Sequence, residues 1–178
     1  MFKIVPMLNP DGVINGSYRC SLSGYDLNRV WHCDNKISSP EIYYTKKAIL
    51  EQDSCFLFID LHAHSKKKGV FMYGCQNKHS PFLSRHIPYL LWKEVQYFNY
   101  YQCNFGMKLG REGTSRLTVH RGLNLPFSYT MEHSFCGPIK ERVHFTTKNY
   151  RDIGKGICFT LKKYYTSANG KEEPEIFR

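Results

Sequence analysis

A mostly apolar run in the first half of the chain, CFLFIDL at 55–61, restricts the possible folds more than any other feature. A strand with one solvent-exposed face alternates apolar and polar residues, whereas a strand covered on both faces is apolar throughout. We therefore expect this run to be a strand buried on both faces. Such strands are typical of α/β folds, in which helices flank a mixed, largely parallel sheet.

Strand-like and helix-like segments alternate along the rest of the chain. Ser39 and Pro40 form a typical helix start, as an N-cap residue followed by a proline at the first helical position. Apolar residues recur with helical spacing over 149–165, where Gly154 and Gly156 each weaken the helix by about 1 kcal/mol relative to alanine. We expect strands at 2–8, 55–61, 69–74, 116–121 and 127–135, helices at 38–52, 84–101 and 149–165, and a turn at 9–12.

The chain of 178 residues suits one domain, which we expect at 1–166, followed by a polar tail at 167–178. Its seven cysteines are scattered and none lies in a C-x-x-C spacing, which favours free thiols in the cytoplasm. The first residues lack the features of a signal peptide, and every apolar stretch is too short to span a bilayer. We therefore expect a cytoplasmic protein without a membrane partner.

The chain is strongly basic, with 25 Lys and Arg residues against 15 Asp and Glu residues and a net charge of +10. This balance favours an acidic partner. The basic residues are spread along the chain and no nucleic-acid-binding motif occurs, so we expect no nucleic acid partner. An acidic protein segment is the partner that fits best.

Two histidines, His62 and His64, follow the apolar run directly. Residues two apart in an extended chain point to the same side, so both imidazoles can face one site, and imidazole is the commonest metal ligand. The alternative is that they only satisfy polar groups at a sheet edge, which is the better interpretation of an isolated H-x-H pair. Three lysines at 66–68 form either a solvated turn or a patch that attracts an anionic substrate.

Glu132 lies within the otherwise apolar strand expected at 127–135. Glutamate is rarely buried without a partner. A carboxylate beside a metal-bound water can act as a general base, with its pKa raised by partial burial. The alternative places Glu132 on an exposed strand face together with Ser128 and Thr130. The pattern alone favours neither.

Arg19 and the pair Asn28–Arg29 fall in the polar loop after the first expected strand. The planar guanidinium suits a carboxylate, and asparagine adds a donor beside it. The alternative is that both arginines are simply solvated, which is the common case in a basic protein.

Several blocks together closely resemble the zinc metallocarboxypeptidases of the M14 family. Within that family the chain is most similar to the cytosolic carboxypeptidases, which remove glutamate from polyglutamylated tubulin and related proteins. The similarity extends from about Phe2 to Tyr165, nearly the whole chain. It rests on VPMLNPDGVINGSYRCSLSGYDLNRVW, DLHAHSKKKGVFMYGC, EGTSR and SYTMEHSFCG, which occur in the family's order.

The resemblance assigns roles to individual residues. It implies that His62 is a zinc ligand, that Glu132 is the general base and that Arg19 stabilises the oxyanion. It also implies that Asn28 and Arg29 hold the terminal carboxylate of the substrate, and it leaves His64 outside the ligand set. For a cationic pocket that accepts acidic residues, the candidates are Lys108, Arg111 and Arg116.

The chain also departs from the family pattern. The H-x-x-E motif that supplies the other two zinc ligands is absent, Ala63 stands where glycine is usual, and His133 replaces a small residue. We therefore expect the later part of a metallocarboxypeptidase catalytic domain, inactive by itself. In the complete protein it would act on acidic protein tails or glutamylated side chains, such as those of tubulin, at the cytoskeleton or cilium. The alternative is an inactive remnant that binds acidic tails.

Overall fold

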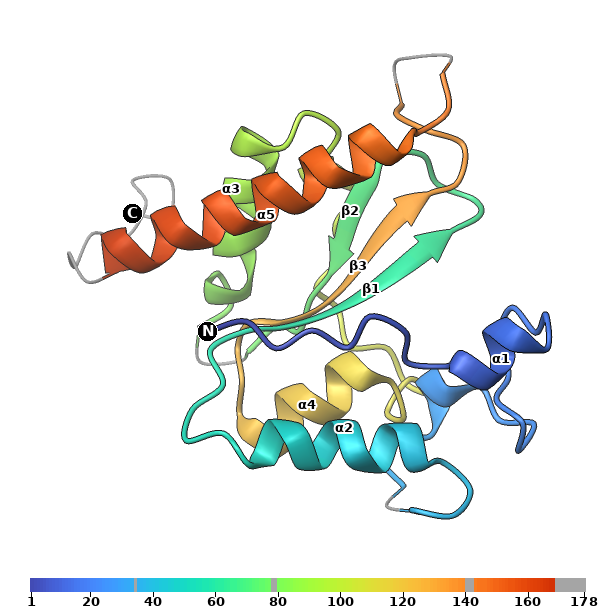
Figure 1. Ribbon diagram of the computed structural model, residues 1–178. Helices are drawn as coiled ribbons and strands as arrows, with labels where there is room; N and C mark the ends of the chain where they lie inside the picture. The colour runs from blue at the N-terminus through green and yellow to red at the C-terminus, as the bar shows by residue number, and fades with distance from the viewer. Residues whose placement is uncertain (34, 78–79, 140–142, 169–178) are drawn as a thin grey trace. The chain divides into compact units, whose positions relative to one another are not determined.

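The computed structural model describes residues 1–33, 35–77, 80–139 and 143–168 (Figure 1). Contacts between Cα atoms divide the chain into two compact units. Met1–Leu57 and Lys108–Leu125 form the first, here called the loop unit. The second, here called the sheet unit, comprises Phe58–Met107 and the chain from Pro126 onward.

The sheet unit contains a mixed sheet of three strands in the order β1-β3-β2. The central strand β3 (Ser128–Ser134) runs parallel to β1 (Phe58–His64) and antiparallel to β2 (Val70–Tyr73). This arrangement confirms the predicted α/β class with a mixed sheet and flanking helices. The predicted strands at 69–74 and 127–135 are also confirmed.

The strand register gives the sheet one polar face and one apolar face. Residues paired across adjacent strands point to the same side, and side chains alternate between sides along each strand. The polar face therefore carries Asp60, His62, His64, Phe71, Tyr73, Thr130, Glu132 and Ser134. The apolar face carries Leu61, Val70, Met72, Tyr129, Met131 and His133.

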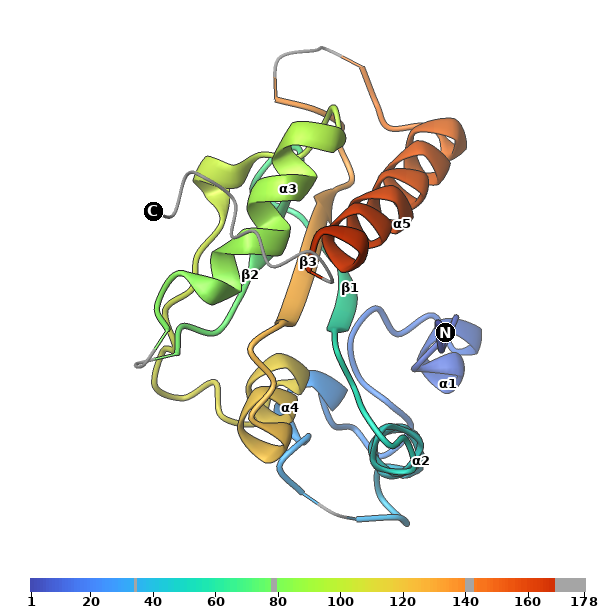
Figure 2. The ribbon, with the colours of Figure 1, turned by 90° about the vertical axis from the view of Figure 1, so that its left-hand side faces the viewer.

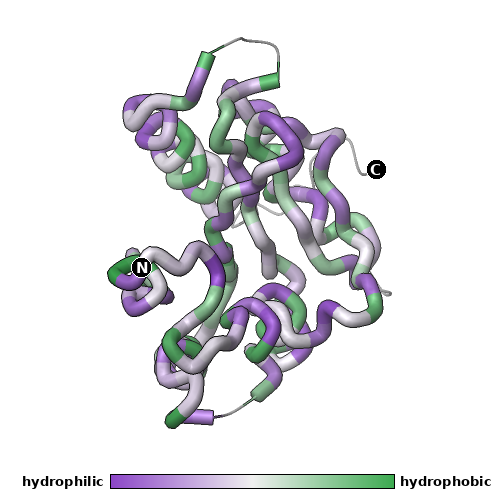
Figure 3. The backbone as a smooth tube through the Cα atoms, turned by 90° about the vertical axis from the view of Figure 1, so that its right-hand side faces the viewer, coloured by the Kyte–Doolittle hydropathy of each residue, from purple (hydrophilic) through white to green (hydrophobic). Residues whose placement is uncertain are grey.

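Two helices cover the apolar face, α3 (His86–Glu94) and α5 (Thr147–Ala168), and they pack against each other (Figure 2). Hydrophobic and hydrophilic residues alternate around the turns of α5 (Figure 3), as expected from the predicted amphipathic stripe. Ile153 and Leu161 are buried. Two short 3-10 helices, η2 (Leu83–Arg85) and η3 (Tyr100–Gln102), flank α3 in the sequence.

The loop unit is built from short helices around a small core. Its helices are α1 (Pro10–Ile14), η1 (Leu27–Arg29), α2 (Pro40–Leu50) and α4 (Ser115–Leu123). Trp31, Ile42 and Leu117 are almost fully buried in this core. The backbone amide of Trp31 donates to the carbonyl of Gly113 at 3.0 Å, which joins the loop after η1 to the start of α4.

Two predicted strands are wrong, and both lie in the loop unit. Residues 2–8 form no strand, and the side chains of Phe2, Ile4 and Val5 are exposed rather than packed against a neighbour. The turn predicted at 9–12 is instead the start of α1, capped by the side chain of Asn9. β propensity expresses packing on a sheet, and no strand among the described residues pairs with this segment.

The segment 116–121 is helical, as the middle of α4, and not a strand. The prediction rested on the apolar and β-branched residues of RLTVHR. Thr114 precedes the helix in an extended conformation as its N-cap, and Asn124 ends it in the left-handed conformation with φ of 49°. Thr114 makes no side-chain capping bond, but a left-handed asparagine is a typical helix end, and the composition of RLTVHR alone did not indicate it.

The boundaries of other elements differ from the predictions. β1 begins at Phe58 and extends through His64, so both histidines lie inside the strand and not after it. Leu61 is 65% exposed, and within the described residues β1 forms one edge of the sheet, so burial on both faces is wrong. The helix expected at 84–101 is shorter, and α5 extends to Ala168, two residues into the predicted tail. The rest of that tail, 169–178, lies outside the described residues.

Among the described residues, no helix combines the length and the apolar character needed to cross a bilayer.

Candidate active site

His62 and Glu132 are paired in register on the adjacent parallel strands β1 and β3. Register partners point to the same face, and neighbouring strands lie about 4.8 Å apart. The structure therefore brings together, on the polar face, two residues that are 70 positions apart in the sequence. This pairing places an imidazole beside a carboxylate at the centre of the candidate site.

Asp60 lies beside the His62 ring on the polar face. Its Oδ1 lies 3.1 Å from Nδ1 of His62, and its side chain is only 15% exposed. The two atoms lie at ion-pair distance, and a carboxylate beside Nδ1 is a common neighbour of metal-binding histidines. Asp60 was not predicted as part of the site. The sequence feature that could have identified it is its position two residues before His62, on the same side of a strand.

Glu132 is buried, with 8% of its surface exposed, as are Ser128 and Thr130. The alternative of an exposed strand face is therefore wrong. Burial raises the pKa of the Glu132 carboxyl, and the nearby Asp60 raises it further, whereas His62 and Lys67 lower it. Its Oε2 atom has no hydrogen-bond partner among the described residues. A carboxyl of this kind is suited to accept a proton from a reacting group.

His64 has a different environment. Its Nδ1 accepts hydrogen bonds from the backbone amides of Lys66 and Lys67, both at 3.0 Å, and its ring packs edge-on against Phe71. Burial is the main cause that lowers the pKa of His64, and the charges of the two lysines add to it. Because Nδ1 already shapes the turn after β1, that atom is not available to a metal ion.

The polar face offers one candidate metal ligand, His62, and one candidate general base, Glu132. His62 offers an imidazole with a carboxylate beside Nδ1, and Oε2 of Glu132, which has no hydrogen-bond partner among the described residues, suits a general base that hydrogen-bonds a water molecule. A catalytic zinc ion takes three protein ligands and keeps one position open. In the parts of the chain that the structure describes, no group of three or more His, Cys, Asp or Glu side chains could hold a metal ion.

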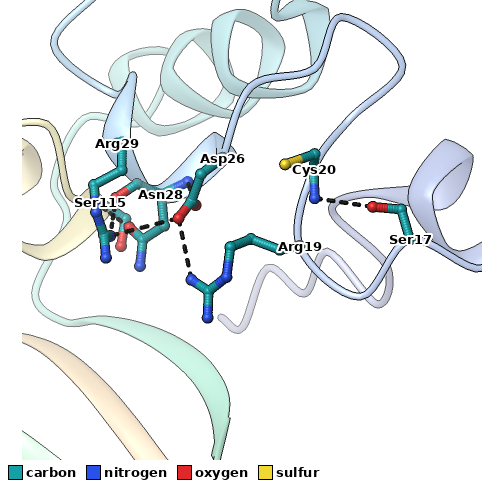
Figure 4. A network of polar contacts seen from close by, with 7 residues as sticks. All are labelled: Ser17, Arg19, Cys20, Asp26, Asn28, Arg29 and Ser115. Carbon is teal, nitrogen blue, oxygen red and sulfur yellow. Dashed lines mark hydrogen bonds and ion pairs between the residues drawn. The ribbon is translucent and has the colours of Figure 1, made fainter.

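In the loop unit, Asp26 connects the residues proposed to bind substrate (Figure 4). Its Oδ2 lies 3.1 Å from Nη1 of Arg19 and 4.0 Å from Nη1 of Arg29. Its Oδ1 accepts a hydrogen bond from the backbone amide of Asn28 at 3.0 Å and so caps η1. The hydrogen bond to Asp26 is the main cause that raises the pKa of Arg19. Asp26 was not predicted as part of this cluster, although an aspartate two residues before Asn28 is a typical capping position.

Asn28 and Arg29 are also held by their surroundings. Oδ1 of Asn28 accepts from the backbone amide of Ser115 at 2.9 Å, at the first residue of α4 (Figure 4). Nη1 of Arg29 donates to the carbonyl oxygen of Asn28 at 2.7 Å. The side chains of Arg19 and Arg29 are 54% and 38% exposed, so both guanidinium groups remain accessible to an anion. The structure thus brings Arg19, Asn28 and Arg29 into one cluster.

The three candidates for a cationic pocket lie in different environments. Lys108 and Arg111 are exposed in the loop before α4. Arg116 is 9% exposed within α4, one residue after the Ser115 amide that binds Asn28. Of the three, Arg116 is therefore the one that adjoins a residue, Ser115, with a hydrogen bond to this cluster.

No protein-family model matches the sequence. Curated proteins do match it. Cytosolic carboxypeptidase 2 of Homo sapiens is 41% identical over 170 residues, which cover 90% of this chain and 19% of that protein. Over this stretch, the chain belongs to the cytosolic carboxypeptidases. Cytosolic carboxypeptidase 3 of Bos taurus is also 41% identical, over 92% of the chain and 17% of its own length. This member therefore spans about a fifth of the length of the curated relatives it matches.

Solved structures match the fold of this cytosolic carboxypeptidase chain. A metallo-carboxypeptidase from Burkholderia cenocepacia superposes with a TM-score of 0.80 and 21% identity, over 92% of this chain and 44% of that one. A metallo-carboxypeptidase from Pseudomonas aeruginosa, in complex with (2-guanidinoethylmercapto)succinic acid, gives a TM-score of 0.74 at 21% identity. It covers 86% of this chain and 43% of that one. These likenesses show the metallocarboxypeptidase fold.

Proposed function

We propose that this chain is part of the catalytic domain of a zinc-dependent carboxypeptidase that removes C-terminal glutamate from acidic protein tails or glutamylated side chains. Polyglutamylated tubulin is the proposed substrate, and the cytoplasm, at the cytoskeleton or cilium, is the proposed location. The observation that carries the proposal is the pairing of His62 with the buried Glu132, with Asp60 on Nδ1 of the imidazole. Membership of the cytosolic carboxypeptidases supports it.

In the sheet unit, each residue has a separate task. Asp60, at ion-pair distance from Nδ1, would hold the His62 ring for binding of the metal through Nε2. When bound, zinc polarises the scissile carbonyl and lowers the pKa of a bound water toward ~7. Glu132 takes a proton from the attacking water and passes it to the leaving amine, a task suited to a carboxyl whose pKa is raised by burial. The remaining zinc ligands would come from outside the described residues.

In the loop unit, the proposed tasks concern the substrate's charges. Arg19 would stabilise the negative charge that develops on the carbonyl oxygen, where electrostatic stabilisation has the largest effect on rate. Asn28 and Arg29 would hold the free terminal carboxylate through charge-assisted hydrogen bonds. This requirement for a chain end explains exopeptidase action. Lys108, Arg111 and Arg116 remain candidates for binding the glutamate side chain.

The test uses Glu132→Gln in the complete zinc-loaded protein. We expect hydrolysis of a C-terminal glutamate peptide to fall by about 100-fold or more, because a general base contributes 10²- to 10⁴-fold. Zinc content, measured by elemental mass spectrometry, should not change. Glu51→Gln, an exposed residue at the end of α2, is the matched control and should retain activity.

Retained turnover in Glu132→Gln would remove this residue from its proposed role. The alternative of a non-catalytic protein that binds acidic tails draws on the net charge of +10 and the exposed guanidinium groups of Arg19 and Arg29. Binding of acidic peptides without zinc and without turnover in the complete protein would favour that alternative.

A further inference from the structure

Lys67 differs from the two lysines beside it. The three residues at 66–68 form the turn after β1, and Lys66 and Lys68 are exposed, whereas Lys67 is half-buried. The backbone amides of Lys66 and Lys67 both donate to Nδ1 of His64, which holds the turn in place. Gly69, with φ of +80°, lets the chain enter β2 directly afterwards. The charge run in the sequence therefore contains one positioned cation and two solvated ones.

The ammonium group of Lys67 lies over the polar face of the sheet. Its Nζ is 4.7 Å from the centre of the Phe71 ring and 5.6 Å from that of Tyr73, both on this face. Nζ also donates to the carbonyl oxygen of Gln102 at 3.4 Å. Phe71 is the register partner of Glu132 on β2, as His62 is on β1. Lys67 is thus positioned beside the row that contains the candidate catalytic pair.

The electrostatics agree with this placement. The charge of Lys67 lowers the pKa of Glu132 and of His64, which are both on the polar face. Among the described residues, no carboxylate lies within 4.0 Å of its Nζ. An ammonium group has three donors, and a single long hydrogen bond to a carbonyl leaves donors free. The side chain is therefore a fixed cation with the capacity to bind an anion.

We infer that Lys67 is a specificity residue of the proposed carboxypeptidase, which binds the side-chain carboxylate of an acidic residue in the substrate peptide. The inference deepens the proposed function and rests on it. The aromatic rings under Nζ hold the cation by cation–π attraction while leaving its donors for the substrate. Lysine acts here as a point charge with adaptable donors, and this suits a flexible acidic side chain.

The test is a binding measurement in the complete zinc-loaded protein carrying Glu132→Gln, so that the probe is not consumed. The probes are a pentaglutamate and a pentaglutamine peptide, with Kd measured by isothermal titration calorimetry at about 0.15 M salt, where distant surface charges are screened. Lys67→Met keeps the aliphatic stem and removes the charge. We expect it to weaken pentaglutamate binding by roughly tenfold or more, the effect of losing a charge-assisted hydrogen bond. Pentaglutamine binding should stay the same.

Lys66→Met and Lys68→Met are the matched controls, because they remove the same charge from exposed neighbours. We expect each to change pentaglutamate binding by less than about twofold, since exposed charges contribute little. Lys67→Arg should retain most of the affinity, which guards against a variant that merely misfolds. Equal losses for all three Lys→Met variants, or equal losses for both peptides in Lys67→Met, would overturn the inference.

The two proposals fail in different ways. If the protein with Glu132 intact hydrolyses peptides but Lys67→Met binds pentaglutamate normally, only the role of Lys67 is lost. If the protein with Glu132 intact hydrolyses no C-terminal peptide at all, the carboxypeptidase proposal fails, and the role of Lys67 in substrate specificity fails with it.

Discussion

At the scale of single residues, burial in the sheet unit changes the chemistry of side chains that look alike in the sequence. The seven cysteines are an example, because all are free thiols. Cys103 accepts a hydrogen bond from the backbone amide of Met72, and its thiol points to the carbonyl of Asn99. Burial raises the pKa of Cys103 to about 12, whereas Cys33, Cys136 and Cys158 are exposed.

This difference predicts the order of alkylation. A thiol with a pKa near 12 has roughly one part in ten thousand of thiolate at pH 8, and only the thiolate reacts. We expect iodoacetamide at pH 8 to modify Cys33, Cys136 and Cys158 in the folded chain and to leave Cys103 unmodified, with reaction at Cys103 increasing only as the pH rises. Peptide mass spectrometry measures each site. Rapid labelling of Cys103 would contradict its environment in the structure, and labelling in denaturant provides the control.

Part of the candidate site could be predicted from the sequence, residue by residue. The residue types of His62 and Glu132 suggest chemistry, and the structure shows that they are paired on one face. The contribution of Asp60 and Asp26 was missed because both act on other side chains, through contacts that form only once strand and loop geometry is fixed. Sequence spacing alone suggests such partners without selecting among them.

At the scale of elements, helix α5 contains two glycines, Gly154 and Gly156, whose surroundings in the structure differ. A Cβ atom added at Gly154 would meet no atom within 4 Å, whereas one at Gly156 would lie 2.5 Å from Cγ2 of Val95. Val95 is buried, and its β-branched side chain has little freedom to move. Gly156 therefore marks the close approach between α5 and the end of α3.

The two alanine variants should differ in their effect on stability. We expect Gly154→Ala to raise the free energy of unfolding by about 1 kcal/mol through helix propensity. Gly156→Ala gains the same propensity and loses roughly 1–3 kcal/mol to overpacking, so the net change should be destabilising or close to zero. Urea denaturation followed by circular dichroism measures both. A gain in stability for Gly156→Ala equal to that of Gly154→Ala would show that the two helices are not packed as described.

Elements were predicted well where local signals and the later packing agree. The start of α2 at Ser39 and Pro40 and the stripe of α5 were correct for this reason. The segments 2–8 and 116–121 were wrong because β-branched and apolar residues do not determine secondary structure by themselves. The first has no strand partner among the described residues, and the second is followed by the left-handed Asn124, a typical helix end.

At the scale of the whole molecule, the sheet unit carries the proposed metal ligand and general base, and the loop unit carries the proposed substrate-binding groups. Only His62 is proposed as a zinc ligand, and the described residues form no group of three or more metal-binding side chains. The affinity of a protein for zinc depends on the number and geometry of its ligands.

We therefore expect the 178-residue chain alone to bind zinc weakly and to hydrolyse no peptide. Elemental mass spectrometry after gel filtration should give far less than one zinc per chain, and a C-terminal glutamate peptide should remain intact. His62→Ala provides the comparison and should lower the residual zinc further. One zinc per chain together with turnover would show that the chain supplies a complete site.

Side chains of β1 alternate between the two faces of the sheet, and this alternation limits the insertions and deletions that the strand can accept during evolution. Insertion or deletion of a single residue before His62 would turn every following side chain of the strand over, sending the imidazole toward α5 and bringing Leu61 or Ala63 opposite Glu132. Loss or gain of an even number of residues would preserve the orientation. Insertions and deletions in this strand are therefore tolerable only in even numbers if His62 is to stay beside Glu132.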